Sequence, residues 1–364
     1  MEITDVTIRE ACQMPDRTYS VSQRVRAGQL LDSLNLGAIQ AGFPIVSEAD
    51  RETVNRLAVD TDTPVVALAR AVDRDVTAAI DENADIVEVF IPVSGQQLTH
   101  VADTTLDAVL ESVESAIDRL EAAGVCMRLT AMDAFRTDPD RLMTVYALLD
   151  GRGRFGLADT VGIANPNTVQ WLLDTLEGSG VAIGDLRVHF HDDLGLATAN
   201  TLAAARRGVG GADVSVCSLG ERAGNASLEQ VAISATLDNI DSIDLKTDRL
   251  IPTCIEIMEA LDEPIPDRAP VVGRASRKHE TGIHTAAMLR EPSTFEPYDP
   301  TIFGGERGLF FGSQTGGKAA KELLKRVGHE PTPSAISSLL DDLDERGSVD
   351  LETALDLADD AGKQ

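Results

Sequence analysis

Short apolar segments alternate with longer segments of helical periodicity through the first two thirds of the chain. The segment 86–91 is almost entirely apolar, as expected for a buried strand, whereas 106–123 repeats apolar residues at helical spacing and stops at Gly124. The strands predicted in this way are 3–8, 38–41, 64–68, 86–91, 125–130, 155–158, 187–190 and 213–217. Strands that alternate regularly with helices predict a parallel α/β fold.

The number of these units favours one closed (β/α)8 TIM barrel, because about 250 residues is the usual size of that fold. An open, doubly wound sheet is the alternative, but no G-x-G-x-x-G motif follows the first predicted strand. Polar clusters follow the carboxyl ends of the predicted strands, where the barrel fold places its chemistry. That placement indicates an enzyme.

The periodicity breaks near residue 262, where Pro264, Pro266 and Pro270 indicate a linker. Residues 1–262 are therefore predicted to form the catalytic barrel. Residues 263–364 are predicted to form a linker followed by a small, mostly helical lid or dimerisation region. Its predicted helices are 318–327, 334–343 and 351–361.

Two of the six histidines, His189 and His191, lie two residues apart on the seventh predicted strand. Residues at i and i+2 of a strand face the same side, so both imidazoles point to one place. Glu10 follows the first strand and Asn225 the eighth, and strands one, seven and eight are neighbours in a closed barrel. This mixture of oxygen and nitrogen ligands suits a divalent ion such as Zn²⁺, Mn²⁺ or Mg²⁺.

Each of these residues also has a structural interpretation. The histidines suit a strand end, Glu10 suits an ion pair at the barrel mouth, and Asn225, which follows a glycine, suits a turn. It is their placement on adjacent strand ends that favours the metal. Arg9 is expected to point away from these ligands unless the backbone turns there; inside the pocket its cation would stabilise an oxyanion.

Charge and composition exclude several other classes of function. The net charge is −28, from 60 acidic and 32 basic residues, and such a surface repels nucleic acid and anionic membranes. It is typical of proteins from a salt-rich cytoplasm, where ions screen the repulsion. The hydrophobic content of 43% argues against disorder. The sequence has no apolar run of transmembrane length and four scattered cysteines, so we expect a cytoplasmic protein without a disulfide framework.

Five motifs at the predicted strand ends resemble one family of enzymes. They are 5–13 (DVTIREACQ), 41–44 (AGFP), 159–162 (DTVG), 189–193 (HFHDD) and 220–225 (GERAGN). Together they resemble the acetyl-CoA-dependent 2-oxo acid condensing enzymes, which include the 2-isopropylmalate, homocitrate and citramalate synthases. The segment 279–284 (HETGIH) resembles the histidine segment that follows the barrel in this family. The resemblance extends over residues 3–328.

The resemblance implies a metal-dependent acyltransferase that uses acetyl-CoA as co-substrate. Its metal would be held by Glu10, His189, His191 and Asn225, and would grip the carboxylate and keto oxygen of a 2-oxo acid. Arg9 would stabilise the developing alkoxide.

Further residues have implied roles in catalysis and substrate binding. The resemblance assigns acid/base chemistry to His284, which in this family reaches into the partner subunit's barrel, and so implies a homodimer. It places Gln13, Thr160 and Arg136 on the substrate side. Arg136 matches the homocitrate pattern, where an arginine pairs with the distal carboxylate of the substrate. A salt bridge to a neighbouring aspartate, Asp133 or Asp138, is the equally open alternative.

Four departures from the family pattern cluster on the substrate side rather than the metal side: Phe295 replaces a tyrosine, Met132 a glutamate, Gln97 a histidine and Ala11 a glycine. They predict altered acid/base or substrate handling at an intact metal site. Two other functions therefore stay open: a lyase or aldolase on the same barrel, and a non-catalytic metabolite-binding relative. The post-barrel segment and the GERAGN loop favour the synthase over the lyase.

Overall fold

The structure is a computed structural model that describes residues 1–240 and 243–363. It consists of two compact units, the first from Met1 to Ile265 and the second from Pro266 onward. Among the helices of the described residues, none is long and apolar enough to span a bilayer.

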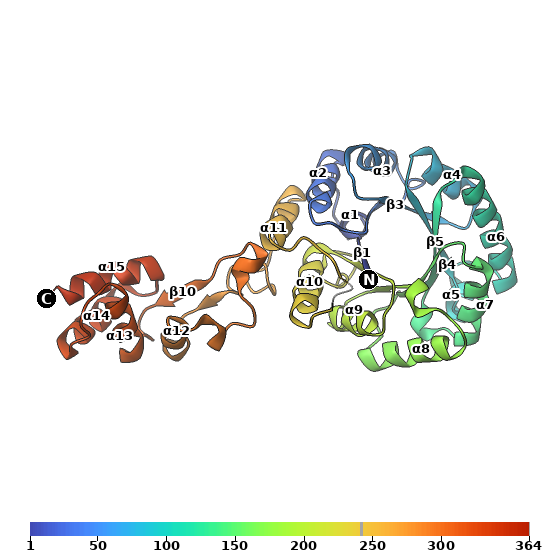
Figure 1. The fold of residues 1–364 in the computed structure, drawn as a ribbon. Helices are drawn as coiled ribbons and strands as arrows, with labels where there is room; N and C mark the ends of the chain where they lie inside the picture. The colour runs from blue at the N-terminus through green and yellow to red at the C-terminus, as the bar shows by residue number, and fades with distance from the viewer. Residues whose placement is uncertain (241–242, 364) are drawn as a thin grey trace. The chain divides into compact units, whose positions relative to one another are not determined.

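The first unit is a closed barrel in which strands β1 to β8 pair in parallel in sequence order and β8 pairs back with β1 (Figure 1). The strands are β1 (Glu2–Asp5), β2 (Ala38–Gly42), β3 (Val65–Arg70), β4 (Ile86–Pro92), β5 (Cys126–Met132), β6 (Arg154–Asp159), β7 (Leu186–Phe190) and β8 (Gly211–Val214). The predicted TIM barrel is therefore confirmed, and the open sheet is wrong. A barrel of parallel strands brings all their carboxyl ends to one mouth.

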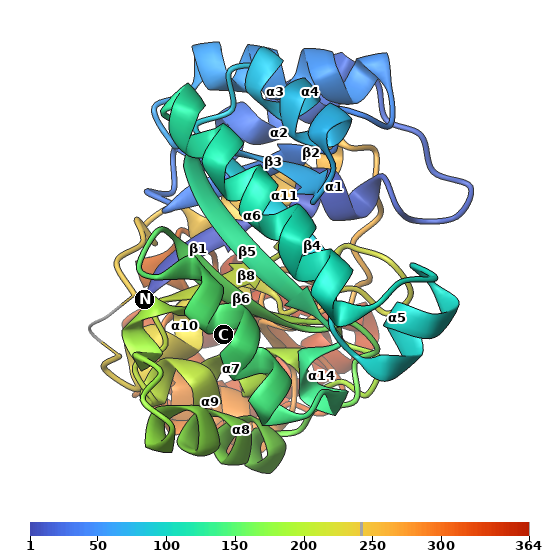
Figure 2. The same cartoon turned by 90° about the vertical axis from the view of Figure 1, so that its right-hand side faces the viewer.

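Helices surround this barrel; helix α6 packs against strands β4 and β5, and in Figure 2 it runs alongside β5. The helices of this unit are α1 (Thr7–Ala11), α2 (Val21–Asp32), α3 (Glu48–Asp60), α4 (Asp73–Asp81), α5 (Gly95–His100), α6 (Leu106–Ala123), α7 (Pro139–Leu149), α8 (Pro166–Gly178), α9 (Ala197–Arg206), α10 (Leu228–Leu237) and α11 (Leu250–Ala260). Ser47 caps α3 by accepting a hydrogen bond from the backbone N–H of Asp50, and α6 ends at Gly124, whose φ is 71°.

The first strand is shorter than predicted, because it ends at Asp5 and the helical turn α1 begins at Thr7. The Asp5 carboxylate accepts hydrogen bonds from the backbone N–H of Thr7 at 2.8 Å and from its hydroxyl at 2.9 Å. These bonds turn the chain out of the sheet. Arg9 and Glu10 consequently lie on one turn of helix above the end of β1.

Charged side chains, rather than apolar ones, meet inside the barrel near the amino ends of its strands. Arg128 of β5 and Arg187 of β7 are 3% and 4% exposed, and both contact Glu2 and Thr4 of β1. Gly211 of β8 leaves room for this group, since a Cβ there would lie 2.1 Å from Nη1 of Arg187.

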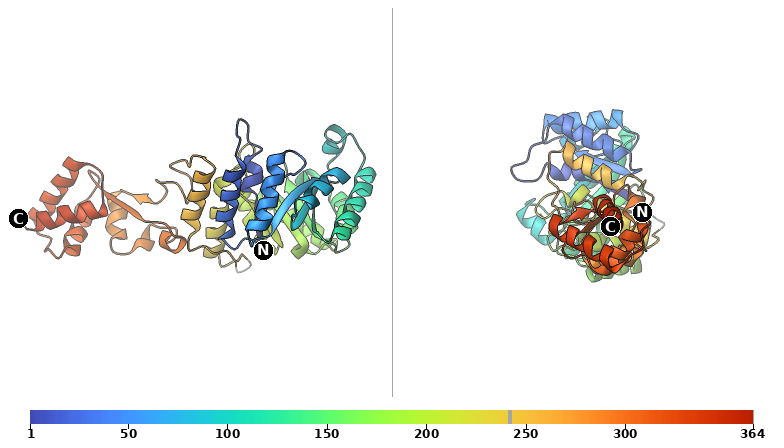
Figure 3. Two further views of the ribbon diagram at one scale, coloured as in Figure 1. Left: turned by 90° about the horizontal axis from the view of Figure 1, so that it is seen from above. Right: turned by 90° about the vertical axis from the view of Figure 1, so that its left-hand side faces the viewer.

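The second unit combines a small sheet with a helical group, which forms the red part of Figure 3. Its sheet has the order β11-β10-β9, and its apolar core includes Phe311, Leu323, Leu339 and Leu343. The elements are β9 (Lys278–His279), α12 (Gly282–Met288), β10 (Gly308–Phe311), α13 (Gly317–Arg326), α14 (Pro333–Arg346), β11 (Val349–Asp350) and α15 (Leu351–Gly362). The predicted helical character of the C-terminal region is confirmed.

Candidate metal centre and substrate cavity

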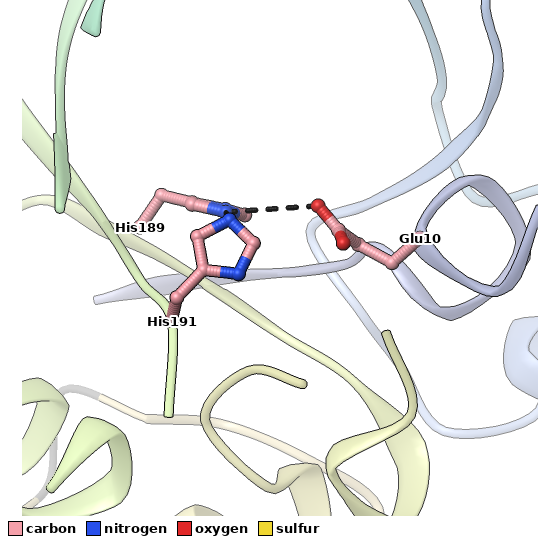
Figure 4. A group of neighbouring side chains, drawn as sticks. All are labelled: Glu10, His189 and His191. Atoms are coloured by element: carbon pink, nitrogen blue, oxygen red, sulfur yellow. Dashed lines mark hydrogen bonds and ion pairs between the residues drawn. The ribbon is translucent and has the colours of Figure 1, made fainter. Parts of the chain in front are cut away.

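Glu10, His189 and His191 converge at the carboxyl ends of β1 and β7 (Figure 4). Nε2 of His189 lies 3.4 Å from Nε2 of His191 and 3.7 Å from Oε1 of Glu10. One ligand atom from each residue lies within 4.8 Å of the other two, and all three residues are buried. An oxygen and two imidazole nitrogens at this spacing can share one divalent ion.

Asn225 lies beside this group, because its backbone forms an isolated bridge with that of His191. It is 1% exposed, yet neither its Oδ1 nor its Nδ2 has a hydrogen-bond partner among the described residues. A Cβ placed on Gly220 would lie 2.3 Å from Nδ2 of Asn225 and 3.1 Å from Oε2 of Glu10, so both side chains border that glycine. An orphaned buried amide next to two imidazoles and a carboxylate fits a metal site, because a ligand bond would satisfy it.

Electrostatics prepare these side chains to act as ligands. Burial raises the pKa of Glu10, but Arg9 and the two histidines outweigh burial and lower it to about 2. Burial and the neighbouring His189 lower the pKa of His191 to about 3. For His189, burial lowers the pKa, but the hydrogen bond and the charge of Asp213 raise it further, so the net shift is upward. Glu10 is therefore anionic and His191 neutral at pH 7, as metal ligands must be.

Arg9 is held in the same site, because α1 turns its side chain inward. Its Nε donates to Oε1 of Gln40 at 2.6 Å, and its Nη1 donates to Oε1 of Gln13 at 3.1 Å and pairs with Glu10. The Gln40 amide in turn donates to Oε2 of Glu88 at 2.9 Å. The backbone turns at α1, and Arg9 therefore points towards the ligands and not away from them, as an extended strand would have required.

Arg9, Glu10, His189 and His191 line a cavity of about 190 Å³ at the barrel mouth. Of the residues predicted to meet the substrate, Gln13 and Thr160 line it, as does Met132, one of the departures from the family pattern. Arg136 is absent from its lining, and its guanidinium instead makes two hydrogen bonds to the Asp133 carboxylate, at 2.7 and 2.8 Å. The structure thus forms the salt bridge that was the alternative interpretation of Arg136.

His284 belongs to α12 of the second unit, where its imidazole stacks on the ring of Phe295. The ring centroids are 4.0 Å apart and the planes differ by 24°. Phe295, which replaces the tyrosine of the family pattern, therefore holds the histidine by ring contact.

Gln40, Glu88 and Asp213 were not among the site residues predicted from the sequence, although the sequence holds a signal for each. Each is a polar residue within an otherwise mostly apolar strand, at 0%, 5% and 5% exposure. A buried polar residue needs a partner, so such interruptions mark side chains that point to a polar site.

Comparison with known proteins agrees with this architecture. Residues 1–253 match the HMGL-like family model, and residues 271–349 match the model of the homocitrate synthase post-HMGL domain. The homocitrate synthase AksA of Methanosarcina acetivorans is 37% identical over 333 residues, which cover 90% of this chain and 81% of that protein. A probable 2-isopropylmalate synthase of Methanopyrus kandleri is 33% identical over 350 residues, which cover 95% of this chain and 70% of that protein.

Among solved structures, the HMG-CoA lyase of Brucella melitensis superimposes with a TM-score of 0.62 at 22% identity, covering 71% of this chain and 98% of the lyase. At that identity the likeness shows the barrel fold alone. The match over residues 1–253 and the relatives at 33% and 37% identity show the family as well as the fold. This chain belongs to the HMGL-like family, within its group of homocitrate and 2-isopropylmalate synthases.

Proposed function

We propose that the protein is a metal-dependent acyltransferase that condenses acetyl-CoA with a 2-oxo acid, giving a 2-hydroxy acid with one more carboxylate and free CoA. The observation that carries this proposal is the convergence of Glu10, His189, His191 and Arg9 on one cavity. The match of residues 271–349 to the homocitrate synthase post-HMGL domain supports the synthase over the lyase.

Glu10, His189, His191 and the amide oxygen of Asn225 would hold the divalent ion. When bound, that ion supplies a Lewis acid for the carboxylate and keto oxygen of the 2-oxo acid. Glu10, His189 and His191 line the cavity, so a substrate there would reach an ion held by these residues. No other pair of imidazoles in the described residues shares a site with a buried carboxylate in this way.

Arg9 stabilises the negative charge that develops on the keto oxygen as the new carbon–carbon bond forms. Its guanidinium is already fixed by Gln40 and Gln13, so it needs little reorganisation during the reaction. The methyl carbon of acetyl-CoA loses a proton and attacks the keto carbon, and the alkoxide takes up a proton. Water then cleaves the thioester and releases CoA as a thiol.

His284 is the acid/base residue in this proposal, and the second unit is a lid that completes the barrel of a partner subunit. The division into a catalytic barrel at 1–262 and a lid or dimerisation region at 263–364 belongs to the same proposal. Support comes from the post-HMGL domain match and from the stacking that fixes the imidazole on Phe295.

A second cavity, of about 260 Å³, begins beside Arg9 and suits the anionic part of acetyl-CoA. Arg17 and Arg24 line it; Nη1 of Arg24 lies 3.6 Å from Oδ2 of Asp50, and Nε of Arg17 lies 2.8 Å from Oε1 of Glu263. Guanidinium groups bind phosphate oxygens through paired hydrogen bonds. The two guanidinium groups beside the catalytic cavity therefore support this placement of the coenzyme.

The proposal is tested by release of free thiol from acetyl-CoA in the presence of a panel of 2-oxo acids. The chain is first stripped with a chelator and then supplied with Zn²⁺, Mn²⁺ or Mg²⁺. We expect thiol release that requires both a 2-oxo acid and a divalent ion, and that is abolished in Glu10→Gln but kept in the surface control Glu177→Gln. Binding of 2-oxo acids without thiol release would favour the metabolite-binding relative. Cleavage of a hydroxyacyl-CoA thioester in place of condensation would favour the lyase.

A further inference from the structure

His189 uses both of its ring nitrogens. Nε2 faces Glu10 and His191, whereas Nδ1 lies 3.2 Å from Oδ2 of Asp213 on β8. A carboxylate only accepts hydrogen bonds, so Nδ1 of His189 carries the donated proton. In the neutral ring, the lone pair is then on Nε2, the nitrogen that points into the proposed metal site.

Asp213 is itself held from the other side. Its second oxygen, Oδ1, accepts a hydrogen bond from Nη2 of Arg187 at 3.1 Å. Arg187 and His189 are two residues apart on β7, so both side chains point into the barrel and grip one carboxylate between them. Asp213 is 5% exposed, and a carboxylate at that depth keeps its charge and orientation only while it has such partners.

The contacts continue from Arg187 to the base of the barrel. Nη1 of Arg187 lies 3.0 Å from Oε1 of Glu2, and the same carboxylate pairs with Arg128. Both guanidinium groups donate to the hydroxyl of Thr4, at 2.5 Å from Arg187 and 3.0 Å from Arg128. Two carboxylates and two guanidinium groups balance within this network. It therefore resists rotation of any one member, because a rotation would leave a buried charge unpaired.

We propose that Asp213, fixed by Arg187, is a positioning residue that sets the tautomer and ring orientation of His189, so that affinity for the divalent ion depends on this network. The inference rests on the metal site of the proposed function and is independent of which reaction follows. Among the described residues, Asp213 contacts His189 but no other proposed metal ligand, and Arg187 contacts none of them, so Arg187 acts through Asp213 and Asp213 through His189.

The direct test is Asp213→Asn, measured as affinity for Zn²⁺ and for Mn²⁺ by competition with a fluorescent chelator. The amide has one acceptor for two donors. If its oxygen faces Arg187, its NH₂ faces Nδ1 and forces the proton to Nε2. If its oxygen faces His189, its NH₂ opposes Arg187. We expect a 10- to 100-fold loss of metal affinity, roughly the loss seen when such an outer partner of a ligand is removed.

A second variant, Arg187→Lys, keeps the charge but replaces the planar fork that reaches Asp213, Glu2 and Thr4 by a single ammonium group, so we expect a loss in the same direction. It decides the question if Asp213→Asn does not fold, which thermal unfolding will show. The matched control is Asp185→Asn, the same substitution at an ion pair with Arg154 near the barrel surface, and it should keep wild-type affinity.

The tautomer gives a readout that a merely structural role would leave unmoved. Imidazole ¹⁵N shifts of the metal-free protein, recorded at a pH high enough for the ring to be neutral, should show the proton of His189 on Nδ1 in the wild type, and a changed distribution in folded Asp213→Asn. The inference is overturned if the folded variants bind metal as tightly as the wild type, or if the wild type shows the proton on Nε2. Because no substrate is present, these results stand even if thiol release fails. An active enzyme whose variants keep full metal affinity would reject the inference alone.

Discussion

Gln40→Leu tests the role of Arg9 most directly, because Gln40 is fully buried and contacts Arg9 at 2.6 Å without being a predicted ligand of metal or substrate. The substitution keeps the approximate size of the side chain and removes two hydrogen bonds. One holds the guanidinium, and the other joins the Gln40 amide to Glu88 at 2.9 Å.

The size of the effect follows from the type of hydrogen bond that is lost. A hydrogen bond to a charged group is worth about 1.5–3 kcal/mol. At about 1.4 kcal/mol for each factor of ten, this corresponds to a loss of roughly 10- to 150-fold in kcat/KM. If Arg9 acts mainly on the charge of the transition state, the loss falls on kcat, whereas KM for the 2-oxo acid changes little.

The assay is steady-state thiol release at several concentrations of the 2-oxo acid, together with urea unfolding of each variant. Unfolding is needed because Glu88 loses a buried donor, which costs on the order of 1–3 kcal/mol of stability. The matched control is Asn200→Leu, another buried amide, which donates to the carbonyl of Ala164 and does not line the cavity. The role of Arg9 is refuted if Gln40→Leu stays within about twofold of the wild type in kcat/KM, a change of only ~0.4 kcal/mol, or if Asn200→Leu loses as much.

Three further outcomes are expected. If Arg136 binds the distal carboxylate of the substrate, the wild type prefers 2-oxoglutarate to 2-oxoisovalerate, and Arg136→Leu removes that preference, since a charge-assisted pair is worth about 1.5–3 kcal/mol. Competition between the two acids measures the preference. A wild type that prefers 2-oxoisovalerate would replace the homocitrate interpretation with 2-isopropylmalate synthesis. Burial raises the pKa of Asp5 to about 7, above its unfolded value, so this group's contribution to stability is present in acid and lost as pH rises towards 7. The free energy of unfolding of Asp5→Asn should therefore rise relative to that of the wild type between pH 5 and pH 8. A difference between the two that stays constant with pH would refute this. Phe295→Leu should lower kcat by removing the ring that stacks on His284, whereas Phe295→Tyr keeps the ring and should keep the wild-type kcat. Equal kcat in both variants would show that the stacking does not contribute to catalysis.

The barrel could be predicted from the sequence because its strands are apolar and its helices amphipathic, and these two periodicities differ clearly. The ends of elements were less predictable. The turn at Thr7 depends on two side-chain hydrogen bonds to Asp5, and local polar competition of this kind overrides the alternating pattern that continues to residue 8. The short helix α5 carries too few residues for helical periodicity to show.

The ligand group was accessible from the sequence because adjacent strand ends must meet once a barrel closes. The partners of those ligands were not, since the contact of His189 with Asp213 joins residues 24 positions apart. Its geometry depends on strand register, which apolar patterning alone does not give. Arg136 shows the same limit, because the sequence left both a substrate contact and a salt bridge open, and only coordinates reveal the contact with Asp133.

The pairing of β1 with β8 also bears on how the protein folds. This seam joins Glu2–Asp5 to Gly211–Val214, so it closes the longest loop of the barrel, and such distant pairings form slowly. Glu10 arrives with the first strand, whereas His191 and Asn225 flank the last, and the ligands therefore meet only after the seam has formed. An ion that binds the native state alone adds stability after this step. Bound metal should accordingly slow the unfolding of the barrel while leaving its folding rate unchanged, as expected for an interaction absent from the folding transition state.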